Sequence, residues 1–271
     1  MWTSIALAVG LLNAVPGQAA EPKLKLTNAR ITYGFLGRER TDTKFLPGDL
    51  FFLAFDIVDA KVDPRTGKVF YGMKMELVDS NNKLVFKQDN PNTEVLNTLG
   101  GARLPSFAQV VIGLDQPPGK YTLRVTVTDR ISKDRKELSR NFEVLKRGFG
   151  IVRLTAPCVG FTGQSFMAHF GVVGFRKGTD KVPKVSVRMN ILDENSKATL
   201  TKPFTVEIPK DLPEEAKAED LTVLPMQFPF PLNRPGTFTI QLEATDQISK
   251  ETVKQSYKIT VLDPKKYETG K

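Results

Sequence analysis

The sequence predicts an all-β protein built from two tandem β-sandwich domains, each with about seven antiparallel strands. Three observations lead to this fold class. The chain repeats itself once, its apolar residues alternate with polar ones, and turn-forming residues separate the alternating segments. A length of 271 residues also suits two domains of ordinary size.

The internal repeat is the strongest signal in the chain. Residues 125–145 (VTVTDRISKDRKELSRNFEVL) match residues 242–262 (LEATDQISKETVKQSYKITVL) at a fixed offset of 117. Two further blocks match at offsets of 114 and 115, namely residues 73–83 with 187–197 and residues 48–55 with 163–170. Loops tolerate changes of length and strands do not, so the changing offset indicates a duplicated domain with loop insertions.

Alternation of apolar and polar residues predicts half-buried strands. Residues 120–129 (KYTLRVTVTD) show this pattern, and residues 237–246 (TFTIQLEATD) repeat it. Asp and Asn clusters such as residues 79–82 favour turns between such segments. The strands expected in the first copy are 24–34, 49–58, 69–78, 83–88, 106–114, 120–129 and 136–145. No convincing amphipathic helix is found, and the acidic segment 213–220 is interpreted as a surface turn or loop.

The patterns divide the chain into a signal peptide, a first domain, a linker, a second domain and a tail, at residues 1–19, 20–146, 147–150, 151–263 and 264–271. The first 20 residues lack charged side chains, and small residues precede a cut after Ala19. A membrane anchor or a buried strand is the alternative, but the apolar run is shorter than the ~20 residues that span a bilayer. No later segment looks long and apolar enough to cross a membrane. The sequence therefore predicts an exported protein, periplasmic or extracellular.

Residues 114–129 (LDQPPGKYTLRVTVTD) resemble the penultimate-strand region of immunoglobulin-like (Ig-like) and fibronectin-type-III-like domains. The resemblance implies two Ig-like β-sandwiches, with Tyr121 making the family's tyrosine corner through its hydroxyl. The counterpart of Tyr121 is Phe238, which has no hydroxyl. Leu123 stands where the family has its second cysteine, and the single tryptophan, Trp2, lies in the predicted signal. The chain looks like the Ig-like modules of exported bacterial proteins, and this likeness implies a fold but no ligand.

The chain is basic, with a formal net charge of +9. The excess is spread evenly, because residues 21–146 hold 21 basic and 16 acidic side chains and residues 147–271 hold 18 and 14. Such a charge can attract acidic envelope polymers, although lysines that solvate outer sheet faces produce the same excess. Nucleic acid is not an expected partner, because no Lys/Arg-rich block interleaves with aromatic residues. The single cysteine, Cys158, cannot form an internal disulfide and is expected to be partly buried.

Sequence patterns of catalysis and metal binding are missing. The only histidine, His169, lies on an expected strand on the face opposite Phe170 and has no counterpart in the first copy. The chain has no nucleophile elbow, metal-ligand spacing or phosphate-binding glycine loop. Asp129 and its counterpart Asp246 are expected to cap turns rather than bind calcium. The sequence therefore predicts no enzyme, no cofactor and no metal.

Loops that differ between the two copies are the first places where a binding surface is expected. Residues 56–70 carry three aspartates, too loosely spaced to define a calcium site, and the matching residues 171–183 are basic and rich in glycine. The candidate binding residues of these loops are Asp56, Asp59, Asp63, Arg176 and Lys177.

The long connection 199–233 is the second candidate. It contains Phe228 and Phe230, each followed by a proline, and prolines restrict a strand to the edge of a sheet. Such an edge either accepts a partner strand or is protected against strand addition.

These observations favour a non-catalytic exported binding or structural module that presents loops and sheet edges to an envelope polymer or an extracytoplasmic protein. An exported inhibitor or accessory subunit that acts on an enzyme is the alternative, and an enzyme is the third hypothesis. The ligand cannot be derived from the sequence.

Overall fold

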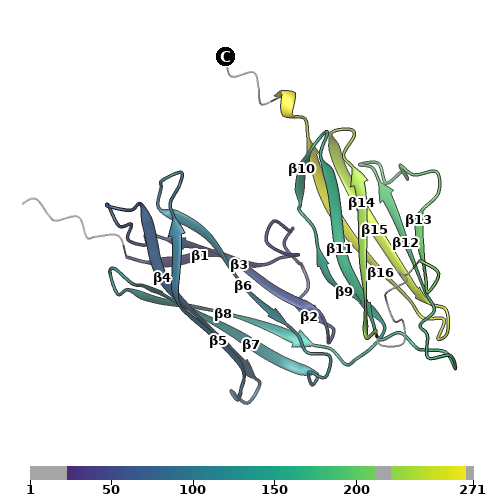
Figure 1. Cartoon of the computed structure of the whole chain (residues 1–271), viewed down its shortest axis with the longest axis horizontal. Helices are drawn as coiled ribbons and strands as arrows, with labels where there is room; N and C mark the ends of the chain where they lie inside the picture. The colour runs from purple at the N-terminus through teal and green to yellow at the C-terminus, as the bar shows by residue number, and fades with distance from the viewer. Residues whose placement is uncertain (1–22, 212–220, 267–271) are drawn as a thin grey trace, which may run out of the picture.

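The computed structural model describes residues 23–211 and 221–266 and contains four β-sheets, arranged as two sandwich-like units (Figure 1). In the first unit, a three-stranded sheet of order β1-β3-β6 packs on a five-stranded sheet of order β2-β8-β7-β4-β5. In the second unit the orders are β9-β11-β14 and β10-β16-β15-β12-β13. Each strand of the second unit, from β9 to β16, therefore takes the place of its counterpart in the series β1 to β8.

The strands of the first unit are β1 Lys25–Ile31, β2 Lys44–Phe45, β3 Leu50–Val58, β4 Lys68–Asp79, β5 Leu84–Leu96, β6 Arg103–Val111, β7 Gly119–Asp129 and β8 Arg135–Val144. Those of the second unit are β9 Gly150–Thr155, β10 Val159–Phe161, β11 Ser165–Val173, β12 Val185–Leu192, β13 Phe204–Ile208, β14 Val223–Pro231, β15 Gly236–Asp246 and β16 Thr252–Leu262. A short 3₁₀ turn, Pro264–Lys266, follows β16. The all-β prediction is confirmed. The predicted signal peptide 1–19 and the acidic segment 213–220 lie outside the described residues.

Two differences from the expected strands have clear physical reasons. Strand β2 and its counterpart β10 were not expected, because strands of two and three residues are too short to show alternation. Strand β5 was expected to end at residue 88 but continues to Leu96, because the twelve-residue β4 offers it a partner along that length. The ladder passes Pro91 through an irregularity between Tyr71 and Met73.

Each unit has its own hydrophobic core between its two sheets. The alternation of residues 120–129 becomes burial, since Tyr121, Leu123, Val125 and Val127 are all buried. The Tyr121 hydroxyl donates to the Pro117 carbonyl oxygen at 2.8 Å, as the resemblance implied.

Buried aspartates at the ends of β7 and β15 organise the matched turns. Asp129 is 0% exposed, and its Oδ1 accepts a hydrogen bond from the backbone N–H of Ile131 at 2.8 Å. Its Oδ2 accepts from the backbone N–H of Lys61 at 2.7 Å, which ties the β3–β4 loop to the turn. The turn-capping prediction is therefore confirmed, and each carboxylate also holds a distant loop.

Asp246 repeats this arrangement in the second unit. Its Oδ1 accepts from the Ile248 N–H at 2.9 Å, and its Oδ2 accepts from the Arg176 N–H and the Ser249 hydroxyl, each at 2.8 Å. Burial acts to raise the pKa of Asp246, but the hydrogen bonds from Arg176, Ile248 and Ser249 outweigh it, so the pKa lies below its ordinary value.

A short segment of the first unit, residues 33–38, contacts the second unit, and we call it the arm. The Leu36 carbonyl oxygen accepts from the Cys158 N–H at 2.9 Å, and the Arg38 N–H donates to the Tyr257 hydroxyl at 3.1 Å. The Tyr33 and Tyr257 rings meet edge to face, with centroids 5.4 Å apart. The arm therefore belongs to the first unit by sequence but packs on the second.

Candidate binding groove

The three aspartates of residues 56–70 do not gather into one site. Asp56 is buried on β3, where it accepts a hydrogen bond from the Asn28 amide at 3.1 Å and pairs with Arg103. Asp59 pairs with the Lys25 ammonium at 3.1 Å. Each carboxylate thus has its own partner.

Asp63 caps the turn that follows it. Its Oδ1 accepts from the Arg65 N–H at 2.8 Å, and its backbone carbonyl accepts from Gly67. Across the described residues, no group of three or more His, Cys, Asp and Glu side chains is arranged to hold a metal ion.

Arg176 and Lys177 lie in the matching loop of the second unit, and both are exposed. The Arg176 backbone is held by Asp246, and Lys177 pairs with Pro183 in an isolated β-bridge. The Arg176 and Lys177 side chains lie at the surface, whereas the Asp56 and Asp63 carboxylates make hydrogen bonds that stabilise the fold.

The two phenylalanines of the 199–233 connection lie on β14, an edge strand that pairs only with β11 among the described strands. Phe228 is 1% exposed and packs between the rings of Phe170 and Phe204, so it is a core residue and presents no surface to a partner. Phe230 is half-buried against Phe166, with ring centroids 5.0 Å apart.

The outer edge of β14 is poor in hydrogen-bond donors. The Leu232 N–H donates to Gln164 of the neighbouring segment at 2.9 Å, which places even-numbered N–H groups toward β11 and odd-numbered ones outward. Pro225, Pro229 and Pro231 fall on the outward side, where they supply no N–H. We therefore expect this edge to be protected against the addition of a partner strand.

An apolar hollow lies in the first unit, between its edge strands β5 and β6. It has a volume of about 690 Å³ and runs between the two sheets of the sandwich. Its apolar lining includes Tyr71, Met73, Met75, Phe86, Phe107, Val110 and Val111, and its polar lining includes Gln88, Asn90, Thr93, Ser106 and Gln109. We call this hollow the β5–β6 groove. None of the described residues that line it is Asp, Glu, Lys or Arg.

Strand β6 forms one wall of the groove and, among the described strands, pairs on one side only, with β3. The Ile112 N–H donates to the Asp49 carbonyl at 2.9 Å, so the even-numbered N–H groups of β6 point toward β3. The backbones of the odd-numbered residues face away from β3, and these residues are Arg103, Pro105, Phe107, Gln109 and Val111. The last three carry an N–H, and the Phe107 and Val111 side chains are exposed.

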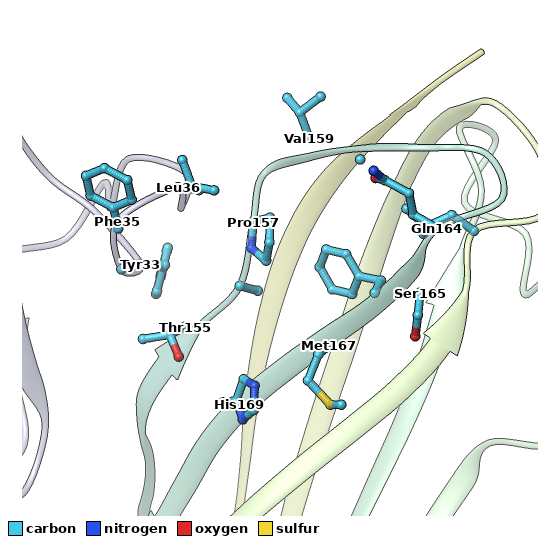
Figure 2. Close-up of a pocket in the computed structure, with 15 residues that line it drawn as sticks. Tyr33, Phe35, Leu36, Thr155, Pro157, Val159, Gln164, Ser165, Met167 and His169 are labelled. Carbon is cyan, nitrogen blue, oxygen red and sulfur yellow. The ribbon is translucent and has the colours of Figure 1, made fainter. Parts of the chain in front are cut away.

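A second, smaller hollow of about 420 Å³ lies where the arm meets the second unit. Figure 2 shows Tyr33, Phe35 and Leu36 on one side of it and Met167 and His169 on the other. His169 is exposed on β11 and lies on the face opposite Phe170, as the sequence predicted. Cys158, close by in the chain, is half-buried against the core, which confirms the expected partial burial.

Comparison with known proteins adds no family. No protein-family model matches the chain, and no curated protein matches it significantly. No helix in the described part of the chain is long and apolar enough to cross a membrane.

Sequence reasoning did not single out β6. The signal was available, because residues 103–111 (RLPSFAQVV) carry apolar side chains at both odd and even positions. A strand with one solvated face should be polar at every second residue. Leu104 and Val110 can serve the interior, and Phe107 and Val111 are then left on the outer side.

Proposed function

We propose that this protein is a non-catalytic, exported binding protein that holds an extended segment of a partner protein in the β5–β6 groove. The segment adds a strand to β6 and places alternate side chains against the apolar mouth of the sandwich. The supporting observation is that β6 pairs with β3 alone among the described strands, so that the backbone N–H groups of Phe107, Gln109 and Val111 face away from the sheet.

The chemistry of the groove favours a polypeptide over an envelope polyanion. A polyanion needs basic side chains at its site, and the described lining of the groove has no Lys or Arg. An extended peptide needs backbone donors and acceptors at strand spacing together with apolar contact, and β6 offers both. Each backbone hydrogen bond contributes about 1 kcal/mol, so a few of them with apolar contact support binding in the micromolar range.

The likeness to Ig-like modules of exported bacterial proteins fits this proposal. It is supported by the Tyr121 corner bond and by the strand order shared by both units. Export itself rests on the sequence of residues 1–19.

The test is selection of peptides from a phage-displayed random library with the purified protein, followed by measurement of dissociation constants. Gln109→Pro removes one outward N–H of β6 and places a ring on the edge, while the inward hydrogen bonds to β3 remain. We expect about a 30-fold loss of affinity, equivalent to about 2 kcal/mol.

The matched control is Gln227→Pro, an outward position on the edge strand β14 of the second unit. We expect this variant to bind the selected peptides as the unaltered protein does. The proposal is wrong if no peptide is selected, or if Gln109→Pro binds them with undiminished affinity while both variants keep the same thermal midpoint.

A further inference from the structure

The β5–β6 groove and the hollow between the units meet at one side chain. Phe35 of the arm lines both of them. Its ring packs edge-on against Phe107 of β6, with centroids 5.5 Å apart. A ligand that lies along β6 therefore reaches the hollow by passing over Phe35.

Exposed apolar side chains mark this path. Val111 and Phe107 on β6 are followed by Phe35 and Leu36 on the arm and by Val159 on β10, and these five residues are between 39% and 64% exposed. Apolar surface that continues across two units is characteristic of an interaction site, whereas isolated exposed apolar residues are ordinary.

The charge of the path agrees with that of the groove. The chain is 25% charged, yet among its described residues no Asp, Glu, Lys or Arg lines either hollow. The occupant of both is therefore uncharged where it contacts the protein, and a single ligand chemistry fits the whole length.

The hollow is formed before any ligand arrives, because the arm is already fixed on the second unit. The Leu36 carbonyl accepts from the Cys158 N–H at 2.9 Å, and the Arg38 guanidinium donates to the Lys258 carbonyl at 3.1 Å. A preformed hollow adds affinity without a large ordering cost.

We propose that the partner segment held by β6 continues over Phe35 into the hollow between the units, where an apolar side chain packs between Leu36 and Val159. This inference rests on the proposed function and extends it, because the recognised segment is then longer than the strand on β6 and both units contribute to binding. Figure 2 shows Leu36 and Val159, with Pro157 lower in the view than both.

The test uses library-selected peptides at full length and truncated stepwise from each end until only the part that depends on Gln109 remains. Val159→Asp places a charge in the hollow. We expect it to weaken the full-length peptides about tenfold and to leave the truncated ones unchanged, whereas Gln109→Pro weakens both. Ile131→Asp, at an exposed apolar residue in the β7–β8 turn, is the matched control and should change neither.

Leu36→Asp provides a second variant in case Val159→Asp disturbs β10, and it should show the same difference between long and short peptides. Equal affinity of full-length peptides for the unaltered protein and for both Asp variants overturns the inference but leaves the proposed function standing. Undiminished binding by Gln109→Pro overturns the proposed function itself. A doubling of the mass in solution that either Asp variant reverses would assign the hollow to a second copy of the chain and also overturn the inference.

Discussion

The edge strands β6 and β14 occupy the same place in two units of the same topology, yet their outer edges differ in the number of backbone N–H groups that they carry. Pro105 lies opposite Asp56 of β3, and Pro225 lies opposite Gly171 of β11, so these two prolines correspond. Four and six residues further along each strand, Gln109 corresponds to Pro229 and Val111 to Pro231. The first unit therefore keeps outward N–H groups at positions where the second has lost them.

The mouths of the two sandwiches differ in the same sense. In the second unit, Phe204 on the five-residue β13 packs edge-on against Phe228, with ring centroids 5.2 Å apart. In the first unit, the thirteen-residue β5 leaves a hollow of about 690 Å³ beside β6. The comparison teaches that one framework supports an open and a closed edge, and that a few residues at the edge decide which.

The shared framework should respond equally in both units, and this is the largest effect that we expect. Asp129→Asn and Asp246→Asn each replace a buried carboxylate by an amide whose NH₂ group faces backbone donors. We expect each to lower the free energy of unfolding by about 3 kcal/mol. Urea denaturation at pH 7 measures this, and a loss in only one unit would contradict the equivalence of the two aspartates.

The stability that the Asp246 carboxylate contributes should depend on pH, and Asp246→Asn measures this. Its pKa in the folded protein is lowered, so its stabilising contribution is present above the unfolded pKa of about 4 and is lost as the pH falls through the folded value. The difference in stability between the unaltered protein and Asp246→Asn should therefore shrink as the pH is lowered from 7 toward 3. A difference that stays constant over this range would show that ionisation of Asp246 does not contribute.

The closed mouth of the second unit can be opened in two steps. Phe204→Ala removes a half-exposed ring and should cost about 1 kcal/mol of stability without creating a peptide site, because the outward prolines remain. Adding Pro229→Gln and Pro231→Val restores the donors that β6 has, and we expect weak binding of the library-selected peptides to appear in the second unit. Binding measured in a Gln109→Pro background reports on the second unit alone. Binding by Phe204→Ala alone would show that the prolines do not protect this edge.

The corner between the last strands gives the smallest expected difference. Tyr121→Phe loses the 2.8 Å hydrogen bond to Pro117 and should lower the free energy of unfolding by about 1 kcal/mol. Phe238, its counterpart, instead carries the Arg234 guanidinium 4.6 Å from its ring centroid, and Arg234→Met should cost less than about 1 kcal/mol. Thermal denaturation of each variant beside the unaltered protein measures both differences.

Much of the fold could be predicted because burial leaves a local trace in the sequence. The alternation in residues 120–129 and the repeated Asp129 and Asp246 turns depend on neighbours a few positions away. The groove could not be predicted in this way. Whether Pro229 faces inward or outward depends on the register of β14 with β11, and the position of Phe35 depends on how the arm packs on another unit.

The interpretation of Phe228 as a surface residue shows the same limit. A proline-flanked phenylalanine on an edge strand has two faces available, and only the register decides that its ring points into the core. The expectation that the prolines of the 199–233 connection restrict it to a sheet edge agrees with β14, which pairs only with β11 among the described strands.

Asp49 has a mechanical consequence for the whole molecule. This buried carboxylate lies in the first unit, where its Oδ2 pairs with Arg40 at 3.0 Å, while its Oδ1 accepts from the Arg153 N–H of the second unit at 2.6 Å. Separating the units would remove one hydrogen-bond donor from a buried charge and break the contacts of the arm with the second unit, and each of these steps is costly. We therefore expect the junction to be rigid, so that a force on a segment bound by the first unit is transmitted to the second unit.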